Sequence, residues 1–216
     1  MKWESSIILA PHDVALFIGK RGSGKSTRAK AALAKAQEAG QRVLAFDPLD
    51  EYSQRGRERS QVLLGPLKQR MTVSELAENL DVLLEDELSL AVVPDTREPE
   101  EWARDFTALL VEVEEVGDLV LAADELAVWG EYAQRHINRA ACLSRHWGDA
   151  GVALVLSSQR ATGIPNTTRT QATQINTGIQ DAPADLDALA DRIGRELVLK
   201  VPKLKRGEAI HWQDSA

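Results

Sequence analysis

The sequence predicts an α/β fold in which a mostly parallel β-sheet is flanked by helices. Short apolar runs of strand length alternate along the chain with segments of helical periodicity. A glycine-rich segment joins the first such run to the first helix. Polar residues follow two later runs, at the strand ends where open parallel sheets bind their ligands.

The expected elements follow this alternation in chain order. Thr72 and Glu75 have the spacing of a capping box, and Pro99 suits the first turn of a helix. Strands are expected at 14–18, 42–46, 61–64, 88–93, 119–123, 152–156 and 172–179. Helices are expected at 26–39, 72–84, 99–116, 132–147 and 184–193, and segments 196–201 and 208–212 are expected to form a closing C-terminal β-hairpin.

Length and composition fit one domain that spans residues 1–216. The single cysteine excludes an internal disulfide and fits a reducing compartment. No apolar run has the length of a membrane span, and the N-terminus does not resemble a signal peptide, so a cytoplasmic protein is expected. The net charge of −7 argues against a protein that coats DNA, but a ring needs positive charge only along its lumen.

Residues 19–26, with the sequence GKRGSGKS, match the phosphate-binding pattern G-x-x-x-x-G-K-[ST]. Glycines let the backbone curl so that successive N–H groups point at phosphate oxygens, and the following helix adds its positive end. Lys25 is expected to reach the β- and γ-phosphates, and the Ser26 hydroxyl to complete the shell of Mg²⁺. The residues expected to bind the nucleotide are Gly19, Arg21, Gly22, Ser23, Gly24, Lys25, Ser26 and Thr27.

Two carboxylates, Asp124 and Glu125, follow the apolar run at 119–123. Asp124 is expected to hold Mg²⁺, directly or through water, and Glu125 to act as general base toward the attacking water. The alternative is that the pair only caps the next helix. The phosphate loop upstream favours the catalytic interpretation.

Gln159 follows the next apolar run, where its side chain would face the γ-phosphate or the attacking water. An ordinary loop glutamine is the alternative. A GTPase should carry a guanine-specifying Asn-Lys-x-Asp run, which the sequence lacks. A small-molecule kinase would not require the acidic pair together with this glutamine. The pattern therefore favours ATP hydrolysis.

Together these segments resemble the FtsK–HerA superfamily of DNA-pumping ATPases. The resemblance also rests on the segment from Asp47 to Tyr52, on residues 151–160, and on Ile164, Pro165 and Arg169. It covers most of residues 14–193. It implies a RecA-like (ASCE) P-loop NTPase core that assembles into a ring, in which an arginine finger of one subunit completes the site of its neighbour.

An arginine finger would stabilise the charge that builds on the γ-phosphoryl group, and the resemblance implies a position between the acidic pair and the strand before Gln159. Arg145 is the preferred candidate because it lies nearest that strand. Arg139, Arg135 and Arg160 are the alternatives. The competing interpretation is that each of these arginines only solvates a helix face.

The chain lacks the membrane segments and the added N-terminal barrel of some members, and so most resembles the stand-alone genome-packaging ATPases of viruses and phages. This implies a hexameric or pentameric ring on double-stranded DNA in the host cytoplasm or at a virion vertex, with a capsid or membrane-vertex partner. The candidates for gripping DNA phosphates are Lys200, Lys203, Lys205, Arg206, Arg55, Arg57 and Arg59. An ATP-dependent assembly factor or switch and a small-molecule kinase remain as alternatives.

Overall fold

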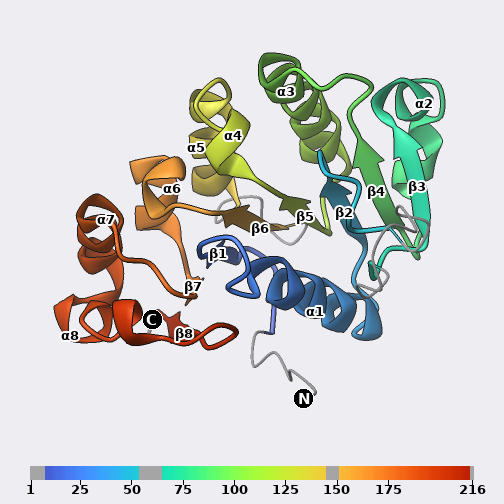
Figure 1. The fold of residues 1–216 in the computed structure, drawn as a ribbon. Helices are drawn as coiled ribbons and strands as arrows, with labels where there is room; N and C mark the ends of the chain where they lie inside the picture. The colour runs from blue at the N-terminus through green and yellow to red at the C-terminus, as the bar shows by residue number, and fades with distance from the viewer. Residues whose placement is uncertain (1–7, 54–64, 145–150, 215–216) are drawn as a thin grey trace.

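An eight-stranded sheet forms the centre of the computed structural model, which describes residues 8–53, 65–144 and 151–214 (Figure 1). The strand order is β3-β4-β2-β5-β6-β1-β7-β8. Neighbouring strands are parallel except for the antiparallel pair β7–β8. The strands are β1 Val14–Ile18, β2 Val43–Phe46, β3 Gln69–Thr72, β4 Ser89–Val93, β5 Leu119–Ala123, β6 Val152–Ser158, β7 Gln174–Thr177 and β8 Ile210–Gln213.

Helices cover the two faces of the sheet unequally (Figure 1). Helix α1 lies on one face, whereas α2 to α7 lie on the other. The α-helices are α1 Lys25–Glu38, α2 Val73–Ala77, α3 Pro99–Val116, α4 Leu126–Trp129, α5 Gln134–Leu143, α6 Asn166–Gln171, α7 Pro183–Ile193 and α8 Arg195–Val198. Short 3₁₀ helices are η1 Leu80–Leu84, η3 Ala161–Gly163 and η4 Val201–Lys203.

The two faces also differ in the size of the side chains that the strands direct toward the helices. The strands direct mainly small residues toward α1, and α1 packs against them mainly through alanines. The helix and the sheet can therefore approach closely. The strand alanines on this face are Ala15, Ala45, Ala91, Ala122 and Ala153. The opposite face carries large side chains, among them an aromatic cluster of Phe46, Phe106 and Trp129 with ring centroids 4.9–5.5 Å apart. Helix α1, and with it the phosphate loop, is thus held firmly against the sheet centre.

Most expected elements are confirmed within a few residues. Strand β6 is longer than predicted, because Ser157 and Ser158 continue its pairing with β1. Strand β3 was not predicted, because this edge strand consists of half-buried, mostly polar residues without an apolar alternation. The strand predicted at 61–64 lies outside the described residues.

Two helical predictions need correction. The helix expected at 72–84 begins with the predicted capping box of Thr72 and Glu75 but ends at Ala77, and a 3₁₀ turn follows. The helix expected from residue 132 is present as α5 and begins at Gln134, but the short α4 before it was not predicted.

The C-terminal hairpin is also corrected. A terminal antiparallel pair is present, but it joins β8 to β7. Segment 196–201, predicted as a strand, is helical instead, because the buried Val198 and Val201 recur at a spacing of three residues.

Candidate functional site

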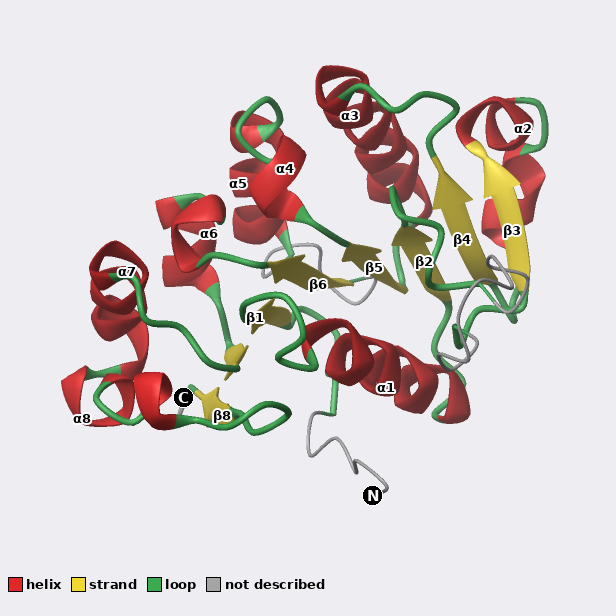
Figure 2. Cartoon of the chain, viewed as in Figure 1, coloured by secondary structure: helices red, strands yellow, loops and turns green. Residues whose placement is uncertain are grey.

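The phosphate loop joins β1 to α1 and is drawn as a green segment between them in Figure 2. Gly22 and Gly24 have φ values of 78° and 84°, in the left-handed region that a side chain would strain. A Cβ at Gly19 would collide with the Ser23 hydroxyl. The backbone path of the loop therefore favours glycine at positions 19, 22 and 24.

Lys25 lies where the carboxyl ends of β1, β5 and β6 meet. Its Nζ is 3.3 Å from Asp124 Oδ1, 3.1 Å from Glu125 Oε1 and 3.2 Å from Ser157 Oγ. Lys25 and both carboxylates are buried, so these charges interact in a medium of low polarity. The adjacent order of β5, β6 and β1 thus brings together residues that are far apart in the sequence.

Gln159 also joins this cluster. Its Nε2 donates to Glu125 Oε2 at 3.1 Å, and Gln180 Nε2 holds the Gln159 carbonyl at 2.7 Å. Glu125 has a φ of 55°, a left-handed conformation that costs a non-glycine residue on the order of 1–3 kcal/mol. This turn after β5 aims the Glu125 carboxylate at both Lys25 and Gln159.

Asp124 offers an unused carboxylate oxygen. Its Oδ1 accepts hydrogen bonds from Ser157 Oγ, Lys25 Nζ and the Glu125 backbone N–H. Its Oδ2 is buried and has no hydrogen-bond partner among the described residues. Burial raises the pKa of Asp124 above its ordinary value, although the nearby Lys25 opposes that shift. An orphaned carboxylate oxygen beside the phosphate loop fits an oxygen-seeking cation such as Mg²⁺.

A cavity of about 460 Å³, here called the phosphate cavity, opens in front of these groups. Most of the phosphate loop lines it, together with Leu49, Glu51, Glu125 and Gln159. Ser26 and Thr27 are half-buried in its wall. Arg21 lines its rim and is exposed. Most of the residues predicted to bind the nucleotide therefore line one space with Glu125 and Gln159, whereas Gly19, Ser23 and Asp124 do not line it.

The segment from Asp47 to Tyr52, part of the predicted family resemblance, had no predicted role in the site. Asp47 is fully buried at the end of β2, and its Oδ2 accepts the Tyr52 N–H at 2.7 Å. Burial raises the pKa of Asp47 to about 7, against the opposing effect of the N–H groups of Glu51 and Tyr52. The Tyr52 hydroxyl hydrogen bonds with Ser157, and burial raises the pKa of Tyr52. This segment thus supports Ser157, which contacts Lys25 and Asp124.

Arg28, one turn into α1, was not predicted as part of the site. Its Nη1 donates to the Ser23 carbonyl at 2.8 Å and its Nε to Asn176 Oδ1 at 2.6 Å. Burial lowers its pKa to about 10. Arg28 therefore ties the phosphate loop to β7. In the sequence it resembles any helical arginine, and no local signal could have identified it.

The arginine-finger candidates lie in different surroundings. Arg145, the preferred one, lies outside the described residues. Arg139 is exposed on α5 and pairs with Glu114 Oε2 at 2.7 Å, and Arg135 is exposed on the same helix. Arg160 pairs with the buried Asp185 at 3.3 Å.

The basic residues proposed for DNA also separate into groups. Lys200, Lys203 and Lys205 are exposed near the C-terminus. Arg206 instead reaches the phosphate loop, where its Nε donates to the Gly22 carbonyl at 3.2 Å. Arg55, Arg57 and Arg59 lie outside the described residues.

The fold and the site together define a RecA-like P-loop NTPase. A family model for the type IV secretion-system coupling protein DNA-binding domain matches residues 10–115. The genome packaging NTPase B204 from Sulfolobus turreted icosahedral virus 2, in complex with ATP-gammaS, is 21% identical with a TM-score of 0.64, over 95% of this chain and 94% of that one. The bacterial conjugative coupling protein TrwBdeltaN70 is 11% identical with a TM-score of 0.63, over 100% and 88%. No functionally curated protein matches significantly.

These comparisons confirm the predicted resemblance to the FtsK–HerA superfamily and the predicted fold class. They also agree with the prediction of an ATPase. Within the part of the chain that the structure describes, no helix combines the length and the apolar character needed to cross a membrane.

Proposed function

We propose that this chain is a Mg²⁺-dependent ATPase that moves double-stranded DNA, and that it acts in viral genome packaging. One observation carries the hydrolytic part: Lys25, which ends the phosphate-loop pattern, lies within 3.3 Å of Asp124 and Glu125 on the neighbouring strand end. A switch that only binds nucleotide would need the loop but not the second carboxylate.

Each residue of the cluster has a role in hydrolysis. Lys25 binds the β- and γ-phosphates, and the loop N–H groups bind the remaining phosphate oxygens. Glu125 accepts a proton from a water molecule whose oxygen attacks the γ-phosphorus, while the bond to the β–γ bridging oxygen breaks. Gln159 orients the Glu125 carboxylate through the hydrogen bond of 3.1 Å. Ser26 and Asp124 would hold Mg²⁺, which would supply positive charge to the phosphates.

The DNA-moving part rests on the relatives. The matching family is described as a DNA-binding domain, and the B204 protein as a genome packaging NTPase. Lys200, Lys203 and Lys205 form an exposed basic group that can contact DNA phosphates without reading bases. We place this chain in a ring of five or six subunits, with Arg145, or else Arg139, Arg135 or Arg160, as the finger that reaches the neighbouring site. A capsid or membrane-vertex protein would recruit it in the host cytoplasm.

The test is hydrolysis of ATP with and without double-stranded DNA. We expect DNA to stimulate hydrolysis by the unchanged chain, and Glu125→Gln to lower the rate about 10²–10⁴-fold because the general base is lost. ATP binding, followed by calorimetry, should remain in Glu125→Gln and disappear in Lys25→Ala.

Glu51→Gln tests which of the two carboxylates in the phosphate cavity, Glu51 or Glu125, acts as the general base. Loss of hydrolysis in Glu51→Gln but not in Glu125→Gln would move the role of general base to Glu51. ATP binding without turnover would favour the assembly factor or switch, and DNA-independent transfer of phosphate to a metabolite would favour the kinase.

A further inference from the structure

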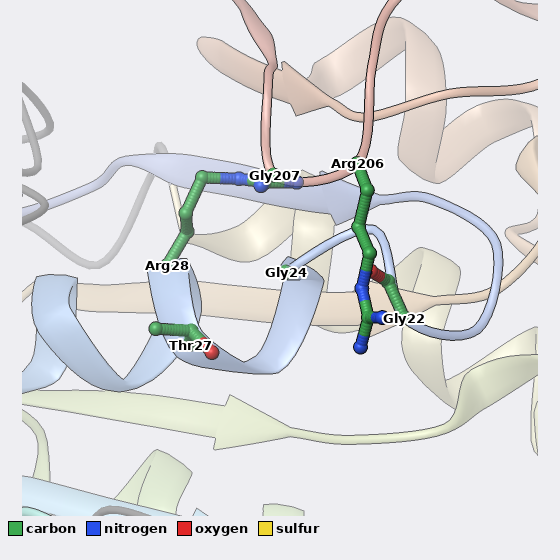
Figure 3. A pocket seen from close by; sticks show the side chains of 6 residues that line it. All are labelled: Gly22, Gly24, Thr27, Arg28, Arg206 and Gly207. Atoms are coloured by element: carbon green, nitrogen blue, oxygen red, sulfur yellow. The ribbon is translucent and has the colours of Figure 1, made fainter. Parts of the chain in front are cut away.

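A second cavity adjoins the phosphate cavity and has no assigned occupant. It has a volume of about 420 Å³, within the usual range for small-ligand sites of roughly 300–1,000 Å³. Six residues line it: Gly22, Gly24, Thr27, Arg28, Arg206 and Gly207 (Figure 3). We call it the side cavity.

The two cavities share Gly22, Gly24 and Thr27 but differ in chemistry. Glu51, Glu125 and Gln159 line only the phosphate cavity. The residues that line the side cavity include no carboxylate, and two of them are arginines. A ligand whose phosphates lie on the loop, with the γ-phosphate toward Glu125, can therefore extend its other end into the side cavity.

Arg206 comes from the opposite end of the chain to form one wall. In Figure 3 its side chain descends from the C-terminal turn to Gly22. The guanidinium lies over Gly22, where an added Cβ would lie 3.8–4.0 Å from Nε, Nη2 and Cζ. Apart from the bond from Nε to the Gly22 carbonyl, no hydrogen bond of its side chain is seen among the described residues. A planar cation is thus presented beside the loop with unused donor capacity.

The turn that carries Arg206 is held beside the phosphate loop by the surrounding structure. Strand β8 pairs with β7, with Asn176 opposite His211, and so brings the preceding turn to the loop. Within the turn, Glu208 Oε2 accepts the Lys205 N–H at 2.8 Å. Gly207 has a φ of 88°, and its Cα would be 3.7 Å from a Cβ at Gly24. Both the conformation and the close approach suit a glycine at this position.

Arg28 has a different role from Arg206. It is buried and holds Ser23 and Asn176, so it fixes the shape of the wall. Arg206 is exposed, and its guanidinium is the flat surface on which an aromatic ring can pack.

We propose that the side cavity binds the nucleoside end of the nucleotide, with the base packed on the guanidinium of Arg206. This inference rests on the proposed nucleotide function. The C-terminal turn then contributes to affinity for ATP, although it lies far from the phosphate-binding pattern in the sequence.

The test compares ATP with inorganic tripolyphosphate, which has phosphates but no nucleoside. Binding to the full chain carrying Glu125→Gln is measured by calorimetry with Mg²⁺ present. We expect Arg206→Ala to weaken ATP binding about tenfold, the size of a partly desolvated cation–π contact, and to leave tripolyphosphate binding unchanged. Arg206→Lys should also weaken ATP binding, because the charge remains but the planar face is lost.

Arg195→Ala is the matched control, since it removes an exposed arginine of the C-terminal part that lines neither cavity, and it should not change ATP binding. Equal weakening of ATP and tripolyphosphate in Arg206→Ala would overturn the inference, because Arg206 would then act on phosphate. Unchanged ATP binding in Arg206→Ala would overturn it as well, while the ATPase proposal stands. If the Glu125→Gln chain bound neither ligand, the proposed function itself would fail.

Discussion

Asp47 and Asp124 are neighbours at the ends of β2 and β5, and both are almost completely buried. Burial raises the pKa of both, and the charge of Asp124 raises that of Asp47 further, as the charge of Glu125 does for Asp124. Each also retains one buried carboxylate oxygen without a hydrogen-bond partner in the described part of the chain. The site thus concentrates negative charge where a phosphate-bound cation would be attracted, at a cost in stability.

The pKa of Asp47 predicts a dependence of stability on pH. Its value of about 7 in the fold exceeds the ordinary 3.8, so the folded chain keeps a proton that the unfolded chain loses. The resulting stabilisation is complete below pH 3.8 and is lost as pH rises to about 7. Asp47→Asn removes the titrating group. The decrease in the free energy of unfolding between low and neutral pH should therefore become smaller by on the order of a few kcal/mol. Urea unfolding in EDTA at several pH values checks this, and parallel profiles for both proteins would contradict it.

Residues of the site differ in how far sequence alone could predict them. The phosphate loop is contiguous, and Asp124, Glu125 and Gln159 directly follow apolar runs, so their shared location followed from sheet topology. Arg28 and Arg206 could not be placed, because their roles depend on contacts with β7 and with Gly22 that no local pattern encodes.

At the scale of elements, the short helix α4 shows how the acidic pair is held in place. Trp129, its last residue, is fully buried, and its Nε1 donates to the Asp124 carbonyl at 2.8 Å. The same ring packs on Phe46 and Phe106. The aromatic cluster therefore couples α3 and β2 to the backbone that positions Asp124.

Replacing Trp129 tests this coupling. Trp129→Phe leaves the Asp124 carbonyl unpaired and a void beside it, so we expect unfolding to become about 2–4 kcal/mol easier. It should also raise the Mg²⁺ concentration needed for half-maximal hydrolysis. Phe106→Leu is the control, since it thins the cluster without touching Asp124. An equal Mg²⁺ requirement in both variants would show that Trp129 only fills space.

Elements with a clear period were predictable, and elements set by tertiary contacts were not. The strand runs at β1, β4 and β5 were located from their apolar residues. The polar edge strand β3 is stabilised by pairing with β4, and its Arg70 bonds to Asp50 at 2.8 Å. The residues that stabilise β3 thus lie outside the strand, so its own sequence does not predict it.

At the scale of the whole molecule, a finger supplied by a neighbour would make each site depend on two subunits. A chain with Glu125→Gln and a chain with Arg145→Ala should each be inactive. Mixing them creates interfaces in which an intact Glu125 meets an intact Arg145, so part of the hydrolysis should return. Steady-state ATPase assays across mixing ratios check this. A mixture no more active than its parts would place the finger elsewhere, and Arg139→Ala, Arg135→Ala and Arg160→Ala would then be mixed in turn.

The strand order has a consequence for the synthesis of the chain. Strand β1 is the first of the described strands in chain order, yet its neighbours in the sheet are β6 and β7, which end at Ser158 and Thr177. On the ribosome, the apolar segment Val14–Ile18 must therefore wait unpaired until most of the chain has been translated. Such long-range pairing slows folding and exposes a strand edge to other nascent chains. The central place of β1, which fixes the phosphate loop, thus makes the assembly of this site depend on contacts that form late in synthesis.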